Sequence, residues 1–272
     1  MLYELTIDNK PTLIMATGGS KVIAYYLQLI IERLGLTGII CEVIEPRDYF
    51  YKANRDMFSN LIAISASGNT NRISEALLDF RGNKYLITEN KKESNYQVVS
   101  WSNELYDREK SFISLATSLG PISLLLDSTT SLNLELGSNE IKRINVKIKE
   151  LLSRSKEKIN KLNVDFKDTS LIQIMSGYET KTSASVLESN LTEVGLAAPV
   201  IHDKGSYCHG RSNLLFQYPN SKLIYLSNGL KELDSLLIES INSEYSNISV
   251  FDTDDLSDNI FWKEYYLILQ MY

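Results

Sequence analysis

The residues best suited to chemistry stand together in one short segment, Ser65-Ala66-Ser67-Gly68-Asn69-Thr70, which holds three hydroxyl side chains and a glycine. The apolar run 61–64 before it has the pattern of a buried strand, and an amphipathic pattern at 71–80 follows it. The segment is therefore predicted to join the carboxyl end of a strand to the amino end of a helix. Backbone N–H groups and the helix dipole make such a position attractive to an anion.

A phosphate group suits this loop, because small hydroxyl side chains let it approach closely and donate hydrogen bonds to it. In an open parallel sheet, ligands bind at the edge where the strands end. We therefore expect Ser65, Ser67 and Thr70 to bind phosphate, together with Ser20, which follows the first predicted strand. The alternative interpretation is that the Ser and Thr side chains only cap the following helix.

The elements that must position this loop alternate between strands and helices along the first half of the chain. Predicted strands lie at residues 12–15, 37–43, 61–64, 85–88 and 97–100. Predicted helices lie at residues 22–34, 48–57, 71–80 and 108–126, the last with a kink at Gly120-Pro121. This alternation is typical of an α/β fold with a parallel sheet.

The second half of the chain repeats the order of strand, small-residue turn and helix, although αβα units can also look alike by chance. The matching segments are roughly 160 residues apart, and they pair 171–177 with 13–18, 198–202 with 41–45, and 221–229 with 60–68. The repeat predicts two similar α/β subdomains, each with a parallel sheet. The second copy's loop, Ser227-Asn228-Gly229-Leu230, lacks the hydroxyl pattern, so only the first copy is expected to bind phosphate.

We place the first subdomain at residues 1–130 and the second at 131–272. The Ser/Thr-rich stretch 127–138 is the predicted linker. A charged helix at 139–162 opens the second subdomain, and an apolar helix ends it.

Length and composition exclude several classes of protein. The 272 residues are 43% hydrophobic and 23% charged, and the net charge of −6 gives no reason to expect nucleic acid or an anionic membrane as a partner. The two cysteines, Cys41 and Cys208, cannot form a disulfide framework, and no His or Cys spacing is typical of a metal site. The first residues lack the apolar stretch of a signal peptide, and no apolar run approaches about 18 residues. We expect a cytoplasmic protein without a metal or other cofactor.

With these motifs the chain resembles the SIS family of sugar-phosphate isomerases and binding proteins, above all its members with two SIS domains. These include the isomerase half of glutamine–fructose-6-phosphate aminotransferase and the fructosamine-6-phosphate deglycases. Residues 65–70 match the family's S-x-S-G-x-T phosphate loop, and residues 16–20 are similar to its first ligand loop, with Gly19 in place of a hydroxyl residue. Residues 110–114 are similar to the K-x-F-[ST] start of the helix that closes the first subdomain.

The resemblance implies a fold of two SIS subdomains, each a parallel sheet flanked by helices in a flavodoxin-like αβα sandwich. It also implies that Gly18, Gly19 and Gly68 contact the substrate, a phosphorylated sugar or aminosugar.

Residues 186–210 resemble the segment that carries the family's catalytic glutamate and histidine. Glu193 and His209 lie sixteen residues apart, as those two residues do. The resemblance implies that Glu193 is the base that moves a proton between C1 and C2 of the sugar. It implies that His209 passes protons to and from the ring oxygen. In relatives the histidine comes from the neighbouring subunit, which implies a homodimer with a composite active site.

The chain also departs from the family pattern. The A-L-K-L-K-E sequence is replaced by residues 188–193, Glu-Ser-Asn-Leu-Thr-Glu, so both lysines are absent, as is the P-R-x-L-A-K tail. Ammonia transfer from glutamine is therefore not expected. The first hypothesis is a phosphosugar isomerase, or a deglycase or deaminase of the same mechanistic type. The second is a non-catalytic sugar-phosphate sensor. A dinucleotide-binding domain fits poorly, because Gly18-Gly19 is not part of a G-x-G-x-x-G motif.

Overall fold

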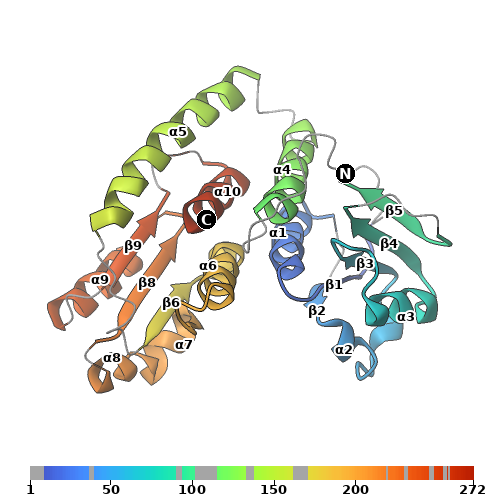
Figure 1. Cartoon of the computed structure of the whole chain (residues 1–272), viewed down its shortest axis with the longest axis horizontal. Helices are drawn as coiled ribbons and strands as arrows, with labels where there is room; N and C mark the ends of the chain where they lie inside the picture. Colours follow the sequence, from blue (N-terminus) through green and yellow to red (C-terminus); the bar gives the residue numbers. More distant parts are fainter. Residues whose placement is uncertain are drawn as a thin grey trace. The chain divides into compact units, whose positions relative to one another are not determined.

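Two compact units make up the chain, Met1–Leu134 and Glu135–Tyr272, and each is built on its own sheet (Figure 1). The structure is a computed structural model. It describes residues 9–36, 40–89, 94–101, 115–132, 138–161, 171–218, 220–229, 232–244, 248–253, 256 and 258–272. The segment 110–114 lies outside the described residues. None of the described helices is long and apolar enough to cross a membrane.

The first unit contains a five-stranded parallel sheet in the order β2-β1-β3-β4-β5. Its strands are β1 (Thr12–Met15), β2 (Cys41–Ile44), β3 (Asn60–Ile64), β4 (Asn83–Thr88) and β5 (Gln97–Ser100). Its helices are α1 (Ser20–Arg33), α2 (Pro46–Tyr49), α3 (Asn71–Asp79) and α4 (Leu115–Leu132), with a short 3-10 turn η2 (Arg55–Met57). This strand order is that of a flavodoxin-like sheet.

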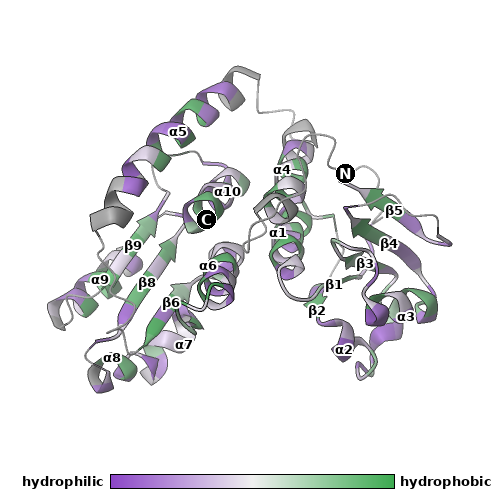
Figure 2. Cartoon of the chain, viewed as in Figure 1, coloured by the Kyte–Doolittle hydropathy of each residue, from purple (hydrophilic) through white to green (hydrophobic). Residues whose placement is uncertain are grey.

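Burial on both faces explains why the central strands of this sheet have continuous apolar sequences. Every residue of β1 and β3 is buried, as is usual for a parallel sheet covered by helices on both sides. On one face, Leu13 and Leu61 pack in a cluster with Ile73 and Leu77 of α3. The helix α3 is amphipathic, with its polar residues turned outward (Figure 2).

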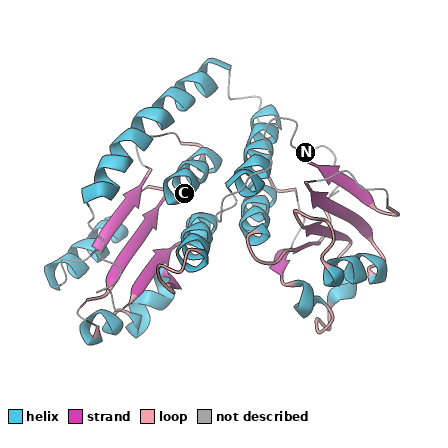
Figure 3. Ribbon diagram, viewed as in Figure 1, coloured by secondary structure: helices cyan, strands magenta, loops and turns pink. Residues whose placement is uncertain are grey.

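The second unit contains a four-stranded parallel sheet in the order β7-β6-β8-β9. Its strands are β6 (Ile172–Ser176), β7 (Val200–Asp203), β8 (Lys222–Ser227) and β9 (Ile248–Asp252). Its helices are α5 (Ser138–Lys161), α6 (Lys181–Glu193), α7 (Lys204–Ser206), α8 (Asn213–Gln217), α9 (Glu232–Glu244) and α10 (Ile260–Met271), with short turns η3 (Tyr178–Thr180) and η4 (Tyr207–Arg211). The order matches that of β2-β1-β3-β4, so the fold of two similar α/β units is confirmed (Figure 3).

The predicted linker 127–138 is wrong over its first half, because α4 continues to Leu132. Ser128 Oγ donates to the Leu124 carbonyl at 2.7 Å, and Thr129 Oγ1 donates to the Leu126 carbonyl at 2.7 Å. Both hydroxyls are satisfied by the backbone of the same helix, so a Ser/Thr-rich sequence remains helical here.

The predicted helix 48–57 is also wrong, since the structure has the shorter α2 and the separate turn η2 in its place. Pro46 starts α2 early, because its fixed φ and missing N–H suit the first helical turn. After the buried Tyr49 the chain turns back, and Lys52 Nζ pairs with Glu42 Oε2 at 2.7 Å. The predicted strand 37–43 is observed as β2 from Cys41 onward, with 37–39 outside the described residues.

A row of polar side chains fixes the register where β1, β3 and β4 begin. The fully buried Asn60 donates from Nδ2 to Thr12 Oγ1 at 3.1 Å and accepts at Oδ1 from Asn83 Nδ2 at 2.9 Å. Both partners stand opposite Asn60 in the strand register. A slip by one residue would leave the buried amide without these bonds, so the row holds β3 in place.

We predict that Asn60→Ala lowers the free energy of unfolding by about 1–3 kcal/mol, because it removes both hydrogen bonds of a fully buried side chain. Urea denaturation measures the change. The exposed Asn54, replaced by Ala, is the control and should change stability little. Equal effects of the two variants would contradict the role given to Asn60.

Candidate functional site

The candidate site lies where the strand order of the first sheet reverses direction. From β1 the chain crosses to β2 on one side, and from β3 it crosses to β4 on the other side. The loops 16–19 and 65–70 leave the carboxyl ends of these two adjacent strands, and they lead into α1 and α3. In open α/β sheets, the crevice for a ligand forms at this point of reversal.

The hydroxyl loop folds back on itself through its own side chains. Ser65 is buried, Thr70 is half-buried and Ser67 is exposed. Ser65 Oγ and Thr70 Oγ1 are hydrogen-bonded at 3.1 Å, and Ser67 Oγ accepts from the Asn69 N–H at 3.2 Å. The Gly68 N–H donates to the Ser65 carbonyl at 3.0 Å. The structure therefore brings the three predicted hydroxyls into one compact turn.

Strand β4 anchors this turn from the side. Thr88 Oγ1 and the Glu89 N–H both donate to the Ala66 carbonyl, at 3.0 and 3.1 Å. Gly68 has a φ of +66°, and a Cβ atom built on it would lie 2.9 Å from Thr88 Oγ1. Both the backbone conformation and the close approach require glycine at this position.

The two helices that start at the site lack caps and acidic residues at their amino ends. Thr70 precedes α3 without making a side-chain cap bond, since its hydroxyl bonds Ser65, and Gly19 precedes α1 with no side chain to offer. Neither first turn has an acidic residue, although negative charge normally stabilises this end of a helix. Lys21 and Arg72 stand there instead. The arrangement leaves room for an external anion, and it does not fit the interpretation of Thr70 as a cap.

Both cations of these first turns are paired with carboxylates. Lys21 forms an ion pair with Glu45, and this partner raises the lysine's pKa. Arg72 Nη1 lies 2.8 Å from Glu75 Oε2, and its guanidinium lies over the Phe50 ring. Both pairs are partly exposed, so a bound anion would find two positive side chains near it without displacing a buried group.

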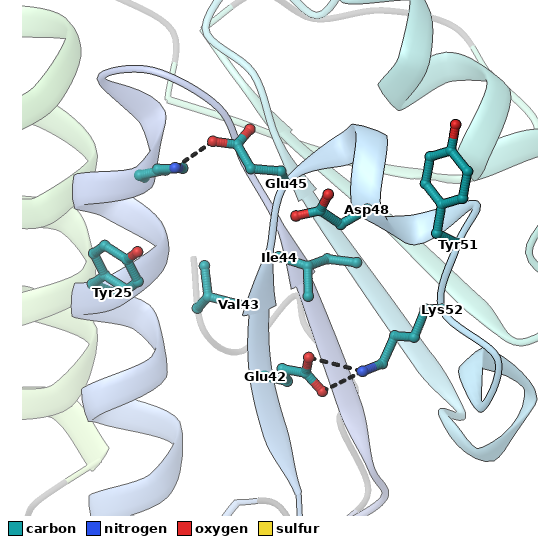
Figure 4. Close-up of a pocket in the computed structure, with 9 residues that line it drawn as sticks. Tyr25, Glu42, Val43, Ile44, Glu45, Asp48, Tyr51 and Lys52 are labelled. Atoms are coloured by element: carbon teal, nitrogen blue, oxygen red, sulfur yellow. Dashed lines mark hydrogen bonds and ion pairs between the residues drawn. The ribbon is translucent and has the colours of Figure 1, made fainter.

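A cavity of about 570 Å³ opens along β2, beside the start of α1 (Figure 4). Two ion pairs line it, Lys21 with Glu45 and Lys52 with both carboxylate oxygens of Glu42, the latter at 2.7 and 2.8 Å. The other lining residues are Tyr25, Val43, Ile44, Asp48 and Tyr51. Three carboxylates face two lysines, so the lining carries an excess of negative charge. Lys21 directly follows Ser20, so one end of the cavity lies at the same edge of the sheet as the loop 16–19.

Glu193 and His209 both belong to the second unit. Glu193 is the last residue of α6, is exposed within its unit, and accepts at Oε1 from Ser189 Oγ at 2.8 Å. His209 is exposed in η4, where the helical backbone is interrupted and Gly210 has a φ of +97°. The first unit thus holds the predicted phosphate-binding residues, and the second unit holds the predicted proton-transfer residues.

The second unit also contains a buried histidine that the sequence motifs did not mark. His202 on β7 is buried, and Arg211 Nη1 lies 3.3 Å from its Nδ1. Because arginine only donates, Nδ1 is the acceptor of this bond. Burial, and then the charge of Arg211, lower the pKa of His202, so this imidazole is neutral at pH 7.

A second residue that the motifs did not mark is Glu264 on α10, which is fully buried. Its Oε1 accepts from the Ser183 N–H, in the first turn of α6, at 2.8 Å. Burial raises the pKa of Glu264 to about 8, although the hydrogen bond from the Ser183 N–H acts in the opposite direction. The sequence does contain a signal, since Glu264 falls on the apolar face of α10 at helical spacing from the buried Phe261 and Ile268.

Among the described residues, no group of three or more His, Cys, Asp or Glu side chains is placed to hold a metal ion. The hydroxyl loop of the first unit has donors that can bind an anion, and the exposed side chains of Glu193 and His209 are chemically able to exchange protons.

No protein-family model and no curated protein matches the sequence. Among solved structures, the chain is similar to glucosamine-6-phosphate deaminase from Thermotoga maritima, with 16% identity and a TM-score of 0.72 over 99% of this chain and 84% of that one. It is similar to the C-terminal domain of glucosamine-fructose-6-phosphate aminotransferase from Francisella tularensis, with 16% identity and a TM-score of 0.68 over 99% and 86%. A third is tagatose-6-phosphate ketose/aldose isomerase from Escherichia coli, with 12% identity and a TM-score of 0.60 over 97% and 83%. At these identities the likeness shows the shared fold.

We predict that Gly68→Ala destabilises the protein more than Gly195→Ala does. Both glycines have a positive φ, at +66° and +67°, but an added Cβ meets Thr88 only at position 68 and meets nothing within 4 Å at position 195. The comparison separates the clash from the backbone strain, which alone costs about 1 kcal/mol. Thermal unfolding of the two variants measures it. Equal losses would show that the approach to Thr88 is not tight.

We predict that the contribution of Glu264 to the free energy of unfolding falls as the pH rises from about 4.5 towards 8. The pKa of this carboxyl is higher in the folded state, about 8, than its ordinary value of 4.5. Unfolding in this range therefore releases a proton, and the contribution is complete below pH 4.5 and lost above about pH 8. Glu264→Gln cannot ionise, so urea denaturation of this variant should show a flatter pH profile than the parent. Identical profiles would contradict the raised pKa.

Proposed function

We propose that this protein binds a phosphorylated sugar or aminosugar and moves a proton between its C1 and C2 atoms. The reaction class is that of an aldose–ketose isomerase, or of a fructosamine-phosphate deglycase or deaminase. The observation that carries the proposal is the pair of uncapped helix amino ends, with the hydroxyl loop between them, at the reversal point of the first sheet. The names of three structures with this fold support a phosphosugar as substrate class.

In this proposal the phosphate group lies at the start of α3. The side chains of Ser65, Ser67 and Thr70 donate hydrogen bonds to its oxygens, and the first amide groups of the helix, which have no intrahelical acceptor, do the same. Ser20 contributes from the start of α1. Gly18, Gly19 and Gly68 carry no side chain, so they let the sugar phosphate approach the backbone.

The cavity beside α1 supports a substrate that carries an amine. Its lining has three carboxylates and two lysines, and both lysines are already paired. Such a lining attracts a cationic group and repels a second phosphate. With the phosphate held at α3, an amine linked to the sugar would point into this cavity along β2.

Glu193 and His209 carry the proposed chemistry. In its ionised form, Glu193 accepts a proton from one carbon and returns it to the next, which passes the sugar through an enediol, or an enolamine for an aminosugar. His209 donates a proton to the ring oxygen when the ring opens and recovers it when the ring closes. Both side chains are exposed on their own unit, so they are available to a substrate bound by another surface. We further propose a homodimer in which His209 reaches the partner's site.

The second candidate function is a sugar-phosphate sensor without catalysis. One observation favours it, because the carboxylate of Glu193 is solvent-exposed and bonded to Ser189 rather than desolvated. A general base works best with a pKa near the working pH, which normally requires burial. Exchange of the substrate's C1 or C2 hydrogen with deuterated solvent separates the two functions, since a sensor catalyses none.

We predict that Ser67→Ala combined with Thr70→Ala weakens binding of fructose 6-phosphate by more than about 100-fold, because each hydroxyl bonded to a charged group contributes about 1.5–3 kcal/mol. Equilibrium titration measures the affinity. Replacing two exposed serines elsewhere, Ser94 and Ser243, by alanine is the control and should leave binding unchanged. Unchanged affinity in the loop variant would move the phosphate away from α3.

We predict that Glu193→Gln and His209→Ala each slow turnover by about 10²–10⁴-fold, and that mixing the two variants restores part of the activity. A mixed dimer contains one site with an intact Glu193 and with the intact His209 of the partner subunit. The measurement is turnover after joint unfolding and refolding of both variants, compared with each variant treated alone. No recovery, with mixed dimers shown by mass spectrometry, would mean that His209 acts within its own chain.

A further inference from the structure

We propose that the chain places its own carboxyl groups at both helix amino ends at the reversal point of its second sheet, and that Glu264 masks a site for a small carboxylic acid at α6. The helices concerned are α6, which follows β6, and α9, which follows β8. They hold the places that α1 and α3 hold in the first unit, because the two sheets share one strand order.

The amino end of α6 already binds a carboxyl group, the side chain of Glu264. Thr180, the residue before α6, makes no cap bond, since its hydroxyl bonds the loop at Gly177 and the Leu226 carbonyl. The Ser183 N–H is instead bonded by Glu264 Oε1 at 2.8 Å, from the neighbouring helix α10. A carboxyl group from elsewhere in the chain thus takes the place of a local cap.

Two polar atoms at this position are buried without a hydrogen bond in the part of the chain that the structure describes. They are Glu264 Oε2 and Ser183 Oγ, and both residues are fully buried. A buried polar atom without a partner is unfavourable, and apolar side chains would fill the same space without this cost. Their presence marks a polar site at the end of α6, built to surround a carboxyl group.

The amino end of α9 carries a carboxylate of its own helix. Asp234 lies in its first turn, is buried, and accepts at Oδ1 from Lys204 Nζ at 2.8 Å. The same region of the first unit, the start of α3, carries Arg72 and no acidic residue. A buried ion pair therefore lies at the start of α9, whereas the first turn of α3 has no carboxylate.

In the second unit, Asn228 follows β8 at the place where the first unit has its hydroxyl loop, and it bonds to the segments around it. Asn228 Nδ2 donates to the Glu179 carbonyl at 3.1 Å, and its own carbonyl accepts from Lys263 Nζ at 3.1 Å. Thr253 Oγ1 donates to Asn228 Oδ1 at 3.4 Å. Asn228 therefore ties together the β6–α6 loop, the end of β9 and α10.

The test is chemical rescue of Glu264→Ala by acetate in the full chain. Removing the side chain leaves a polar space that fits a small carboxyl group, so acetate, bound together with a proton, should raise the Tm of this variant by at least about 3 °C more than it raises that of the parent. Sodium chloride at equal ionic strength is the reference. Leu267→Ala on the same helix is the matched control, because it opens an equally buried but apolar space and should gain nothing from acetate.

Each outcome decides the proposal. Equal effects of acetate on Glu264→Ala, Leu267→Ala and the parent would overturn it. If Glu264→Ala does not fold in chloride, it is refolded in acetate, and failure in both salts would also overturn it. The experiment uses no sugar phosphate, so it can succeed or fail independently of the proposed function.

Discussion

The reversal of strand order between β1 and β3 is the constraint on which the rest of the first unit depends. Because the chain leaves these two adjacent strands in opposite directions, the loops 16–19 and 65–70 meet at one edge of the sheet, and the helices they lead into begin there. The N–H groups that start a helix have no acceptor within it. In this unit neither Gly19 nor Thr70 supplies one from its side chain, so both helix ends suit an external anion.

The two units share one strand order but differ in the side chains that lie at these helix starts. In the first unit, Gly68 and Thr88 hold a hydroxyl loop in a tight turn, and the first turns of α1 and α3 contain no acidic residue. In the second unit, α10 contributes Glu264 to the start of α6, and Asp234 lies at the start of α9. The same strand order therefore carries helix starts without acidic residues in one unit and helix starts with buried carboxyl groups in the other.

The sequence predicts the fold well because a strand that is buried on both faces has a continuous apolar sequence. The strands β1 and β3 are continuous apolar runs, and their repetition in the second half predicts the second sheet. Local side-chain bonds are harder to anticipate. The hydroxyls of Ser128 and Thr129 bond to carbonyls within α4 where composition suggests a linker, and Pro46 starts a helix earlier than periodicity indicates. The hydroxyl loop is found from its motif alone, whereas Glu264 acts through a residue 81 positions away in the sequence, Ser183, and no local pattern reveals that contact.

The most direct measurement is the change in backbone amide NMR shifts when fructose 6-phosphate is added to the full chain, with fructose as the reference. The account predicts that the phosphate-dependent changes concentrate at Gly18 to Lys21 and at Ser67 to Arg72, where the two open helices begin. It predicts none of comparable size at Gly177 to Ser183 or at Ser227 to Gly229, because the second unit is closed by its own groups. Phosphate-dependent changes confined to these second-unit residues, or equal changes with fructose, would contradict it.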